Sequence, residues 1–559
     1  MLRDTKKWER IKTAKEYAGL RTMLDNSYRE FCVDKDIPII KFSDEKEYLQ
    51  TGNRSHFEEK YFLRRKQLSV YALMSMIYPE KQEYIEALED IICEICNEYT
   101  WVLPAHRSLA WQNKRYHIDL FSAETGLYLA EIKYMLIDRL NPLVVERITE
   151  ELDKRIVQCF LNEKSYVEVM KSNWAAVCGA SVGGVFIYEN QRAFECEGVK
   201  HRIDACMEHY LEGCSDDGGT SEGADYWSYG FSYYVLYQDL MRQLTYGKVN
   251  GFNNPKTEKL AGFLTSLYLD EKNVAAFADG GSNSEPKYPL WTLHFLKNEY
   301  GIMLPPVSGA ELSIWKFSWA VRSFLYFEPK YENEVLQPAV KHYELLEWYI
   351  ERKKRYSFAV KGGHNKEQHN HNDIGSFIVT SGGKAVLCDL GAGEYTADYF
   401  GAKRYSFLHT SSLGHNVPIV NGHAQQEGKE YKGKLTVDGN VISIDMKQAY
   451  PVDIPKLTRN FELLDDKIVL RDSFDSELNI VERFVTRIKP EIKDNGDVLV
   501  GNTVLRCITQ AEVKLEEDKT SKINTSSKWS TPDIIYLIDF HIKKDCELFE
   551  MHILPDGIN

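Results

Sequence analysis

Three histidines lie close together in the stretch 361–376, KGGHNKEQHNHNDIGS, and their type and spacing suit proton transfer or metal binding. They are His364, His369 and His371, and four amide side chains and two acids surround them. Histidine titrates closest to neutral pH and is a common metal ligand. So polar a run predicts a loop leading into a strand, and in an extended segment His369 and His371 would share a face. A solvated surface loop is the plain alternative.

A zinc site could form if His371 met Asp389 and His415. Asp389 ends the next predicted strand, and His415 lies in the sequence Leu-Gly-His-Asn. Two imidazoles and one carboxylate are a plausible zinc shell, with water as the fourth ligand. Each residue also has an ordinary interpretation, because Asp389 could cap a turn and His415 could be a satisfied loop histidine.

An acid–base group could come from Tyr226, which lies in the segment EGADYWSYG at 222–230. A tyrosine can transfer protons if a cation or metal lowers its pKa from about 10. In an earlier segment, the amide of Asn173 could bind a carboxylate, and the indole of Trp174 could stack on a sugar. The ordinary alternatives are an aromatic residue starting a helix and an asparagine capping a turn.

Helices are expected to position Asn173, Trp174 and Tyr226. Apolar residues recur on one side of 84–99, and Asn141-Pro142 has the form of a helix start. Similar patterns predict helices at 120–140, 141–159, 199–211, 231–244, 256–268 and 310–325. Many helices in series favour hairpins packed as a ring or solenoid. Polar, aromatic and glycine-rich loops are expected at 101–115, 171–184 and 214–230.

Strands must position the histidines, because the pattern changes after about residue 350. Hairpins are expected at 377–389, turning at Gly382-Gly383, and at 434–446, turning at 438–440. Further strands are expected at 467–472, 480–488, 498–507 and 534–542. The sequence therefore predicts a helical domain at 1–350 and an antiparallel domain of two packed sheets at 351–559, with the charged stretch 351–355 at the junction.

Composition excludes several classes of protein. The net charge of −14 argues against general nucleic-acid binding, which needs a basic surface. No apolar stretch approaches the ~20 residues of a membrane span, and the N-terminus shows no signal peptide. Eleven scattered cysteines, including a Cys-x-x-Cys pair at 93–96 that we assign to core packing, indicate reduced thiols. We therefore expect a cytoplasmic protein that binds neither nucleic acid nor membrane.

Several motifs together resemble the heparinase II/III family of polysaccharide lyases. They are Asn173-Trp174, the glycine-rich and aromatic segment 217–230, HNHNDIGSF at 369–377, Asp389-Leu-Gly and Gly-His415-Asn, and they follow the order of the family. The resemblance implies an incomplete α/α toroid followed by an antiparallel β-sandwich. It also implies β-elimination at a uronic acid, in a uronate-containing polysaccharide or oligosaccharide.

The resemblance also implies roles for individual residues. Asn173 would contact the uronate carboxylate, Tyr226 would act on the C5 proton and the leaving oxygen, and His369 would be a second catalytic group. A structural Zn²⁺ would be held by His371, Asp389 and His415. To substrate binding we assign Trp174, Glu222, Trp227, His364 and Arg107.

Some features depart from the family pattern or leave alternatives open. Asn370 stands where the family often has glycine, and His364 and Tyr229 compete with His369 and Tyr226 for their roles. A local positive cleft would need cations such as Lys361, Lys366, Lys403, Arg404, Arg107 and Arg115. A glycoside hydrolase using paired carboxylates among Asp216, Asp217, Glu222 and Asp225 is one alternative, and a non-catalytic glycan-binding protein is another. The glycan, endo or exo action and the oligomeric state stay open.

Overall fold

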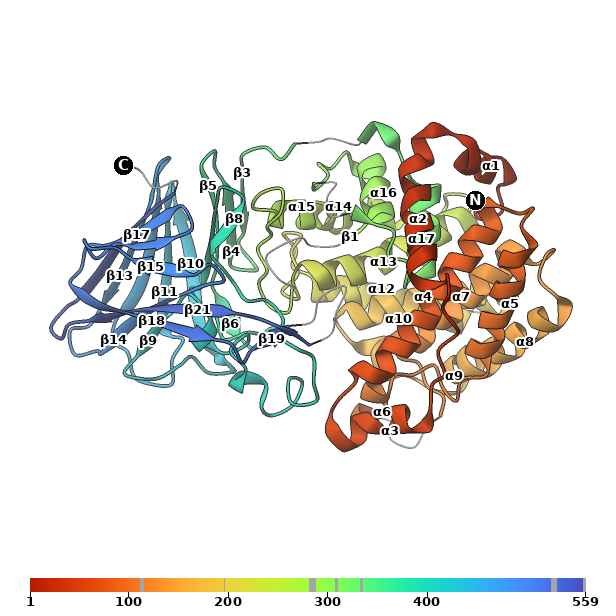
Figure 1. The fold of residues 1–559 in the computed structure, drawn as a ribbon, viewed down its shortest axis with the longest axis horizontal. Coiled ribbons are helices and arrows are strands. Elements are labelled where there is room, and N and C mark those ends of the chain that lie inside the picture. The colour runs from red at the N-terminus through yellow and green to blue at the C-terminus, as the bar shows by residue number, and fades with distance from the viewer. Residues whose placement is uncertain are drawn as a thin grey trace.

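Helices fill the first part of the chain and antiparallel strands fill the second, as Figure 1 shows. The structure, a computed structural model, describes residues 1–110, 115–195, 197–280, 288–306, 310–331, 335–523 and 530–555. The two parts lie side by side along the long axis, with the N-terminus among the helices. The predicted order of a helical part followed by a β part is confirmed.

The helical part contains several long helices and shorter turns between them. Their bounds are α1 (Thr5–Thr13), α2 (Ala18–Phe31), α3 (Phe42–Thr51), α4 (Ser55–Ile77), α5 (Gln82–Cys96), α6 (Pro104–Ala110), α7 (Leu120–Leu136), α8 (Pro142–Leu152), α9 (Gln158–Asn162), α10 (Asn173–Glu189), α11 (Gln191–Phe194), α12 (Glu197–Gly213), α13 (Ala224–Leu244), α14 (Pro255–Ala261), α15 (Phe263–Leu267), α16 (Leu290–Tyr300) and α17 (Phe317–Leu325). The helices expected from one-sided apolar patterns are confirmed, although the segment 310–325 becomes helical only from Phe317.

Two predicted loops are partly helical, and both carry site residues. The segment 171–184 was expected to be a loop, but α10 begins at Asn173 and continues through it. The helix α13 begins at Ala224, inside the predicted loop 214–230. Both helices are buried on nearly all sides. A helix surrounded by protein has no polar face, so it lacks the one-sided pattern by which a surface helix is recognised.

Glycines allow neighbouring helices to approach α10 closely. A Cβ atom added at Gly179 would lie 2.6 Å from the Cβ of Cys206 on α12, and one at Gly184 would lie 2.4 Å from Leu127 on α7. A Cβ at Gly183 would come within 2.9 Å of Tyr237 on α13. The helix that begins at Asn173 is therefore fixed between three others.

The β part is an antiparallel sandwich. Its strands are β3 (Ala339–Tyr343), β4 (Trp348–Arg352), β5 (Tyr356–Lys361), β6 (Gly363–Asn365), β7 (Phe377–Ser381), β8 (Lys384–Leu387), β9 (Pro418–Val420), β10 (Gly428–Asp438), β11 (Val441–Gln448), β12 (Leu457–Leu463), β13 (Ile468–Phe474), β14 (Ile480–Thr486), β15 (Pro490–Ile492), β16 (Val498–Val500), β17 (Thr503–Cys507), β18 (Ala511–Asp518), β19 (Lys522–Ile523), β20 (Thr531–Pro532), β21 (Ile535–Ile542) and β22 (Leu548–Leu554). Both predicted hairpins are present, as β7–β8 and β10–β11.

Most of the described strands of the β part form one nine-stranded sheet and two smaller ones, and β19 pairs with β20 alone. The large sheet has the order β15-β16-β17-β22-β13-β12-β11-β10-β6, and the smaller ones are β3-β4-β5-β7-β8 and β18-β21-β14-β9. The backbone N–H of Cys388, directly after β8, donates to the carbonyl of Val485 in β14 at 3.0 Å. This bond links the end of β8, at the edge of the first small sheet, to β14 of the second. Phe358, Phe461 and Phe484 contribute to the core that the three sheets share.

The sheets begin earlier than the boundary expected at 350–351. The first strand of the sandwich starts at Ala339, and β4 crosses the predicted boundary. The charged stretch 351–355 is the end of β4 and the turn into β5, closed by a bond from Lys353 N–H to the Tyr356 carbonyl at 2.9 Å. The strands β3 and β4 are short, lie beside helices and carry mixed polar and apolar residues. They therefore lack the clear alternation of polar and apolar residues by which a strand is recognised.

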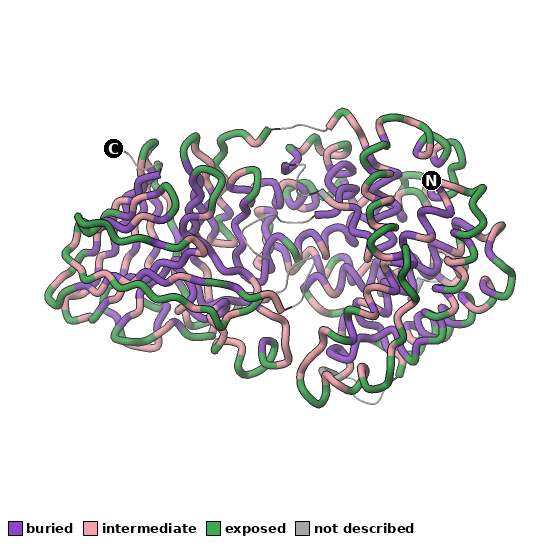
Figure 2. The backbone as a smooth tube through the Cα atoms, in the orientation of Figure 1, coloured by how far each residue is buried: buried purple, intermediate pink, exposed green. Residues whose placement is uncertain are grey.

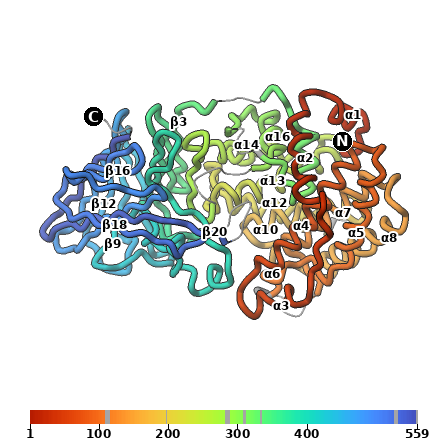
Figure 3. Tube along the Cα trace, viewed as in Figure 1, coloured from red at the N-terminus to blue at the C-terminus, as the bar shows by residue number. Residues whose placement is uncertain are grey.

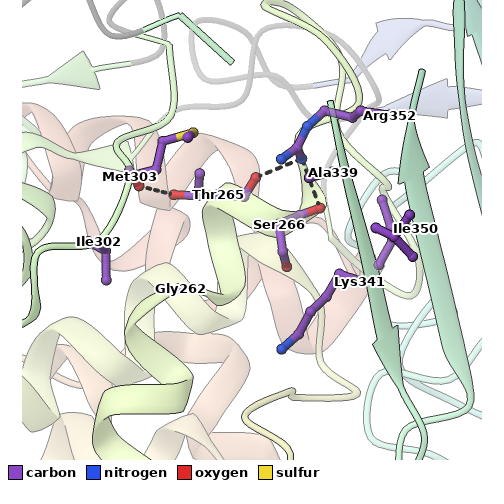
Figure 4. Close-up of a pocket in the computed structure, with 10 residues that line it drawn as sticks. Gly262, Thr265, Ser266, Ile302, Met303, Ala339, Lys341, Ile350 and Arg352 are labelled. Carbon is purple, nitrogen blue, oxygen red and sulfur yellow. Dashed lines mark hydrogen bonds between the residues drawn. The ribbon is translucent and has the colours of Figure 1, made fainter. Parts of the chain in front are cut away.

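Arg352 joins the helical part to the sheets. Its Nη1 atom donates to the carbonyls of Thr265 at 3.2 Å and Tyr268 at 2.7 Å, at the end of α15. Figure 4 shows the guanidinium reaching from the strand to the helical turn. Both line a pocket of about 300 Å³. The pocket lies at the seam between the two parts.

Each part has its own buried interior, and the burial is continuous where they meet (Figure 2). The helical core extends into Trp348 and Ile350 of β4 and Ile378 of β7. The chain passes from helices to sheets in the green region of Figure 3, next to this seam. Within the described ranges, no helix is both long and apolar enough to cross a lipid bilayer.

We expect Gly179→Ala to lower the free energy of unfolding by about 1–3 kcal/mol, because the added methyl overlaps α12 and overpacking is costly. Gly19→Ala is the matched control. It lies in α2 with open space around the added methyl, and alanine is favoured over glycine in a helix by roughly 0.5–1 kcal/mol. Urea denaturation should show opposite shifts, and a Gly179→Ala midpoint at or above wild type would contradict the packing described.

Candidate active site

Tyr226 and His369 stack on each other across the boundary between the two parts. Tyr226 lies in the first turn of α13, and His369 lies in the loop between β6 and β7. Their ring centroids are 3.8 Å apart and the ring planes meet at 21°. The two groups that the sequence placed in separate segments therefore reach one site.

The histidine loop is not extended as expected. His369 has φ of 54°, a left-handed conformation that a non-glycine residue adopts at a cost. Despite this turn, His369 and His371 point to one place, because both imidazoles contact the same carboxylate. The expectation of a shared direction is met through backbone strain instead of through strand geometry.

That carboxylate belongs to Asp279, in the helical part. Its Oδ2 atom lies 2.9 Å from Nδ1 of His369, and its Oδ1 atom lies 3.0 Å from Nε2 of His371. Oδ1 also accepts the hydroxyl of Tyr399 at 2.6 Å, and Oδ2 accepts Nη2 of Arg404 at 2.9 Å. Asp279 is fully buried, so four donors from the β part surround one acid from the helical part.

Electrostatics set the charge states of these groups. Burial alone would raise the pKa of Asp279, but hydrogen bonds from His369 and His371 and the charge of Arg404 hold that pKa well below its usual value. Asp279 is therefore an anion. Burial raises the pKa of Tyr226, and the negative charge of Asp279 raises it further. Tyr226 is thus a neutral phenol, and its hydroxyl lies 3.1 Å from that of Tyr395.

Asn173 reaches the same site through Glu222. The backbone N–H and the side-chain Nδ2 of Asn173, at the start of α10, donate to the two oxygens of Glu222 at 3.2 and 2.8 Å. Oε1 of Glu222 lies 3.7 Å from Nε2 of His369. Burial raises the pKa of Glu222, while the charge of a protonated His369 would lower it. Asn173 has no exposed area in this state and lies behind Glu222.

A metal-binding group lies beside this site. Ligand atoms of His371, Asp373 and His415 all lie within 4.8 Å of one another and are buried. Asp389 adjoins them, with Oδ2 3.2 Å from Nδ1 of His415. Among the described residues, Nδ1 of His371 and Oδ2 of Asp373 are buried without a hydrogen-bond partner. Two imidazoles with neighbouring carboxylates fit a zinc ion, and Asp373 joins the predicted set.

One arginine ties together the two loops that carry these ligands. Arg459 is fully buried and donates from Nη1 to the carbonyls of Gly375 at 3.0 Å and Asn416 at 2.6 Å. Asp472 and Glu482 accept its other hydrogens. Because Gly375 follows His371 and Asn416 follows His415, this guanidinium fixes the separation of the loops.

Other predicted residues lie elsewhere or do other work. Trp227, assigned to substrate binding, is buried in the helical core and donates to the Leu260 carbonyl at 2.9 Å, so it has no surface for a ligand. It follows Tyr226 by one position on a helix, which turns it to a different side. Trp174 is partly buried against His106, with ring centroids 4.9 Å apart.

The predicted cations are mostly paired away from the site. Arg107 pairs with Glu45, Lys366 with Glu427 and Lys403 with Asp398, and Lys361 donates to Asp373 at 2.7 Å. Arg115 donates to the Tyr99 carbonyl. His364 lies 3.2 Å from Glu367 and not in the stack with Tyr226. Of the candidate cations, Arg404 is the one that reaches Asp279.

Sequence reasoning missed Asp279, Tyr395 and Tyr399. One signal for Asp279 was present, because it ends the buried apolar run Val274–Ala278 and precedes two glycines. Ala278 has φ of 61°, a second strained residue at the site. The two tyrosines lie in the long connection between β8 and β9, where no pattern marks them.

Residues 337–538 match a protein-family model described as "Heparinase II/III-like, C-terminal". The matched region is thus similar to the C-terminal domain of that family. It begins just before β3 and covers the histidine loop and both metal-ligand loops, which confirms the resemblance seen in the sequence. A search of curated protein sequences found no match.

Solved structures resemble the whole chain in fold. A mutant heparan sulfate lyase from Pedobacter heparinus aligns with a TM-score of 0.60 and 12% identity, over 99% of this chain and 91% of its own. A chondroitin AC lyase from Streptomyces coelicolor A3, in complex with chondroitin sulphate, gives 0.52 and 11%, over 99% and 82%. A xanthan lyase from Paenibacillus gives 0.55 and 9%, over 100% and 59%. The predicted α/α toroid followed by an antiparallel sandwich is confirmed.

We expect Arg404→Met to lower the free energy of unfolding by about 3–5 kcal/mol, because it leaves the buried charge of Asp279 without its cation. Lys403→Met is the control. The Lys403–Asp398 pair is well exposed, and such pairs contribute about 0–1 kcal/mol. Thermal and urea unfolding measure both, and equal midpoints for the two variants would show that the Asp279–Arg404 pair does not stabilise the structure.

Proposed function

We propose that this protein is a polysaccharide lyase that cleaves uronic-acid-containing polysaccharides or oligosaccharides by β-elimination. The observation that carries the proposal is the stack of Tyr226 on His369, with Glu222 and Asn173 beside it. A proton donor and a proton acceptor on one monosaccharide are what the reaction needs. The fold shared with a heparan sulfate lyase, a chondroitin AC lyase and a xanthan lyase supports the same class of reaction.

The contacts favour different roles for the two rings. Nδ1 of His369 faces the anionic Asp279 and therefore carries a hydrogen, so in the neutral imidazole Nε2 has the lone pair and can take the C5 proton of the uronate. The C5 electron pair then forms the C4–C5 double bond as the C4–O bond breaks. Neutral Tyr226 gives its proton to the leaving oxygen, and the imidazolium of His369 returns a proton to the phenolate.

Glu222 and Asn173 would neutralise the negative charge of the uronate carboxylate. The C5 proton is only weakly acidic, so the carboxylate must be neutralised and the developing negative charge stabilised. Burial raises the pKa of Glu222, which favours the neutral acid, and a carboxylic acid can share its proton with a carboxylate. Asn173 supports this role by donating to both oxygens of Glu222, from its backbone N–H and from Nδ2.

The carboxylates do not favour the hydrolase alternative. Asp216 is mostly exposed and pairs with Lys256, and Asp217 accepts from Ser215 and from the backbone of Leu345. Glu222 is the one acid of that segment with a contact to His369. A hydrolase needs two carboxylates about the scissile bond. The other carboxylate at His369 is Asp279, which is fully buried and already accepts from four donors, so it is not available as the second acid.

We also propose that His371, Asp373, His415 and Asp389 hold a structural zinc. A bound zinc would supply positive charge and would orient the histidine loop, while the proton transfers stay with Tyr226 and His369. The cytoplasmic location expected from the sequence remains a prediction.

The lyase proposal predicts an unsaturated product that absorbs ultraviolet light. The purified protein should be screened against uronate-containing glycans, including heparan sulfate, heparosan, hyaluronan, chondroitin, alginate and bacterial exopolysaccharides. With an active glycan, Tyr226→Phe should lower kcat by about 10²–10⁴-fold, because the leaving oxygen loses its acid.

Tyr229→Phe is the matched control on the same helix. Tyr229 packs against Lys316 and Trp319, away from His369, so this variant should stay within a few-fold of wild type. Full activity in Tyr226→Phe would remove the assigned acid. Cleavage without ultraviolet absorption would identify a hydrolase, and binding without cleavage of any glycan would identify a binding protein.

The zinc proposal predicts about one bound zinc per chain when the protein is purified without chelators. His415→Ala should lose the metal, since it removes one of two imidazoles from the group. His364→Ala, which changes a histidine of the same loop outside that group, should keep it. Elemental analysis of both variants decides, and wild-type protein without zinc would overturn the assignment.

A further inference from the structure

Asp279 holds two imidazoles whose free nitrogens face different places. The carboxylate contacts Nδ1 of one ring and Nε2 of the other, at 2.9 and 3.0 Å. A carboxylate anion only accepts hydrogen bonds, so each nitrogen that faces it carries a hydrogen. In a neutral imidazole the other nitrogen then has a lone pair. One acid therefore sets the tautomers of His369 and His371.

The free nitrogen of His369 faces the reaction site. Its Nε2 lies 3.7 Å from Glu222, and its ring covers that of Tyr226. The side chain is partly exposed, unlike that of Asp279. With the opposite tautomer, Nε2 would carry a hydrogen and could not accept a proton from substrate.

The free nitrogen of His371 faces the metal-binding group. Its Nδ1 is buried without a hydrogen-bond partner among the described residues, and the rings of His371 and His415 are 5.4 Å apart. A metal needs the lone pair of its imidazole ligand, and the group that binds the second nitrogen secures it. The same carboxylate therefore prepares His371 to accept a metal ion.

Backbone strain on both sides of these bonds indicates that the arrangement is maintained for function. Ala278, directly before Asp279, has φ of 61°, and His369 has φ of 54°. Non-glycine residues held in this region cost of order 1–3 kcal/mol each and cluster at functional sites. Arg404 and Tyr399 hold the other lone pairs of the carboxylate, so it cannot rotate freely.

We propose that Asp279 is a positioning residue that couples the metal-binding group to the catalytic base, by fixing the tautomers of His371 and His369 with one carboxylate. Asp279 is fully buried, and its two oxygens accept from His369, His371, Tyr399 and Arg404. Its effect on the reaction rests on the lyase function proposed above, but its effects on the tautomers and on metal affinity do not.

Asp279→Asn tests the coupling, because the amide keeps the size of the side chain but presents a hydrogen donor to one of the two rings. We expect zinc affinity to fall about 10–100-fold, the usual cost of losing a partner of a metal-binding histidine. On the glycan that gives an unsaturated product, kcat should fall about 10²-fold or more with KM changed by less than a few-fold, because the wrong tautomer blocks the base.

One control variant separates this role from general stability. Glu131→Gln removes another fully buried carboxylate, which pairs with Arg322 and Ser318 and contacts no histidine. It should lose stability and keep both zinc affinity and kcat.

Nitrogen-15 spectra of imidazole-labelled wild-type protein test the inference without any variant. Before zinc is added, His369 should show a hydrogen on Nδ1, and His371 should show one on Nε2. Titration with zinc alone should shift the signals of both residues, since the two rings share one carboxylate. Asp279→Asn, if folded, should show a mixture of tautomers at both.

The opposite results would overturn the proposal. These are the other tautomer at either histidine in wild-type protein, His369 signals that zinc does not move, or a folded Asp279→Asn protein with unchanged zinc affinity or unchanged kcat. If no glycan yields an unsaturated product, the lyase function fails, and the spectra and the zinc titration still decide the role of Asp279.

Discussion

A buried ion pair crosses the seam between the two parts of this protein, and the site depends on it. Asp279 comes from the helical part and Arg404 from the sandwich, and their contact takes place away from water. A lone carboxylate would be costly to bury at this position. The Asp279–Arg404 pair therefore forms only when the helical part and the sandwich are packed together. The packing that joins the two parts also sets the geometry of the site.

Most of the architecture could be predicted from the sequence. The periods of surface helices and the glycine turns at 382–383 and 438–440 report local preferences directly, and the corresponding elements formed. The prediction was wrong at α10 and at the start of α13, which are surrounded by other helices. Close packing against other helices determines their residue types, as at Gly179 and Gly184. Such packing does not produce a periodic pattern of apolar residues in the sequence.

The site was predictable where its residues stand in polar motifs. Tyr226, His369, Asn173 and Glu222 come together although nearly two hundred positions separate the two ends of the set. Asp279 was missed because one acid after a buried run resembles any strand or loop end. Trp227 was assigned wrongly because neighbours in sequence face different directions on a helix. Spacing identifies candidate groups, and only the fold says which direction each one faces.

The left-handed backbone at His369 has a consequence for how such enzymes change over generations. Asparagine and glycine adopt this conformation more readily than histidine, and one nucleotide change converts a histidine codon to an asparagine codon. A replacement of His369 by asparagine, which would remove the proposed base, would therefore also relieve the backbone strain. Selection for activity is therefore needed to keep histidine at position 369, because asparagine there would make the protein more stable but inactive. Relatives that bind a glycan without cleaving it are an expected product of this replacement.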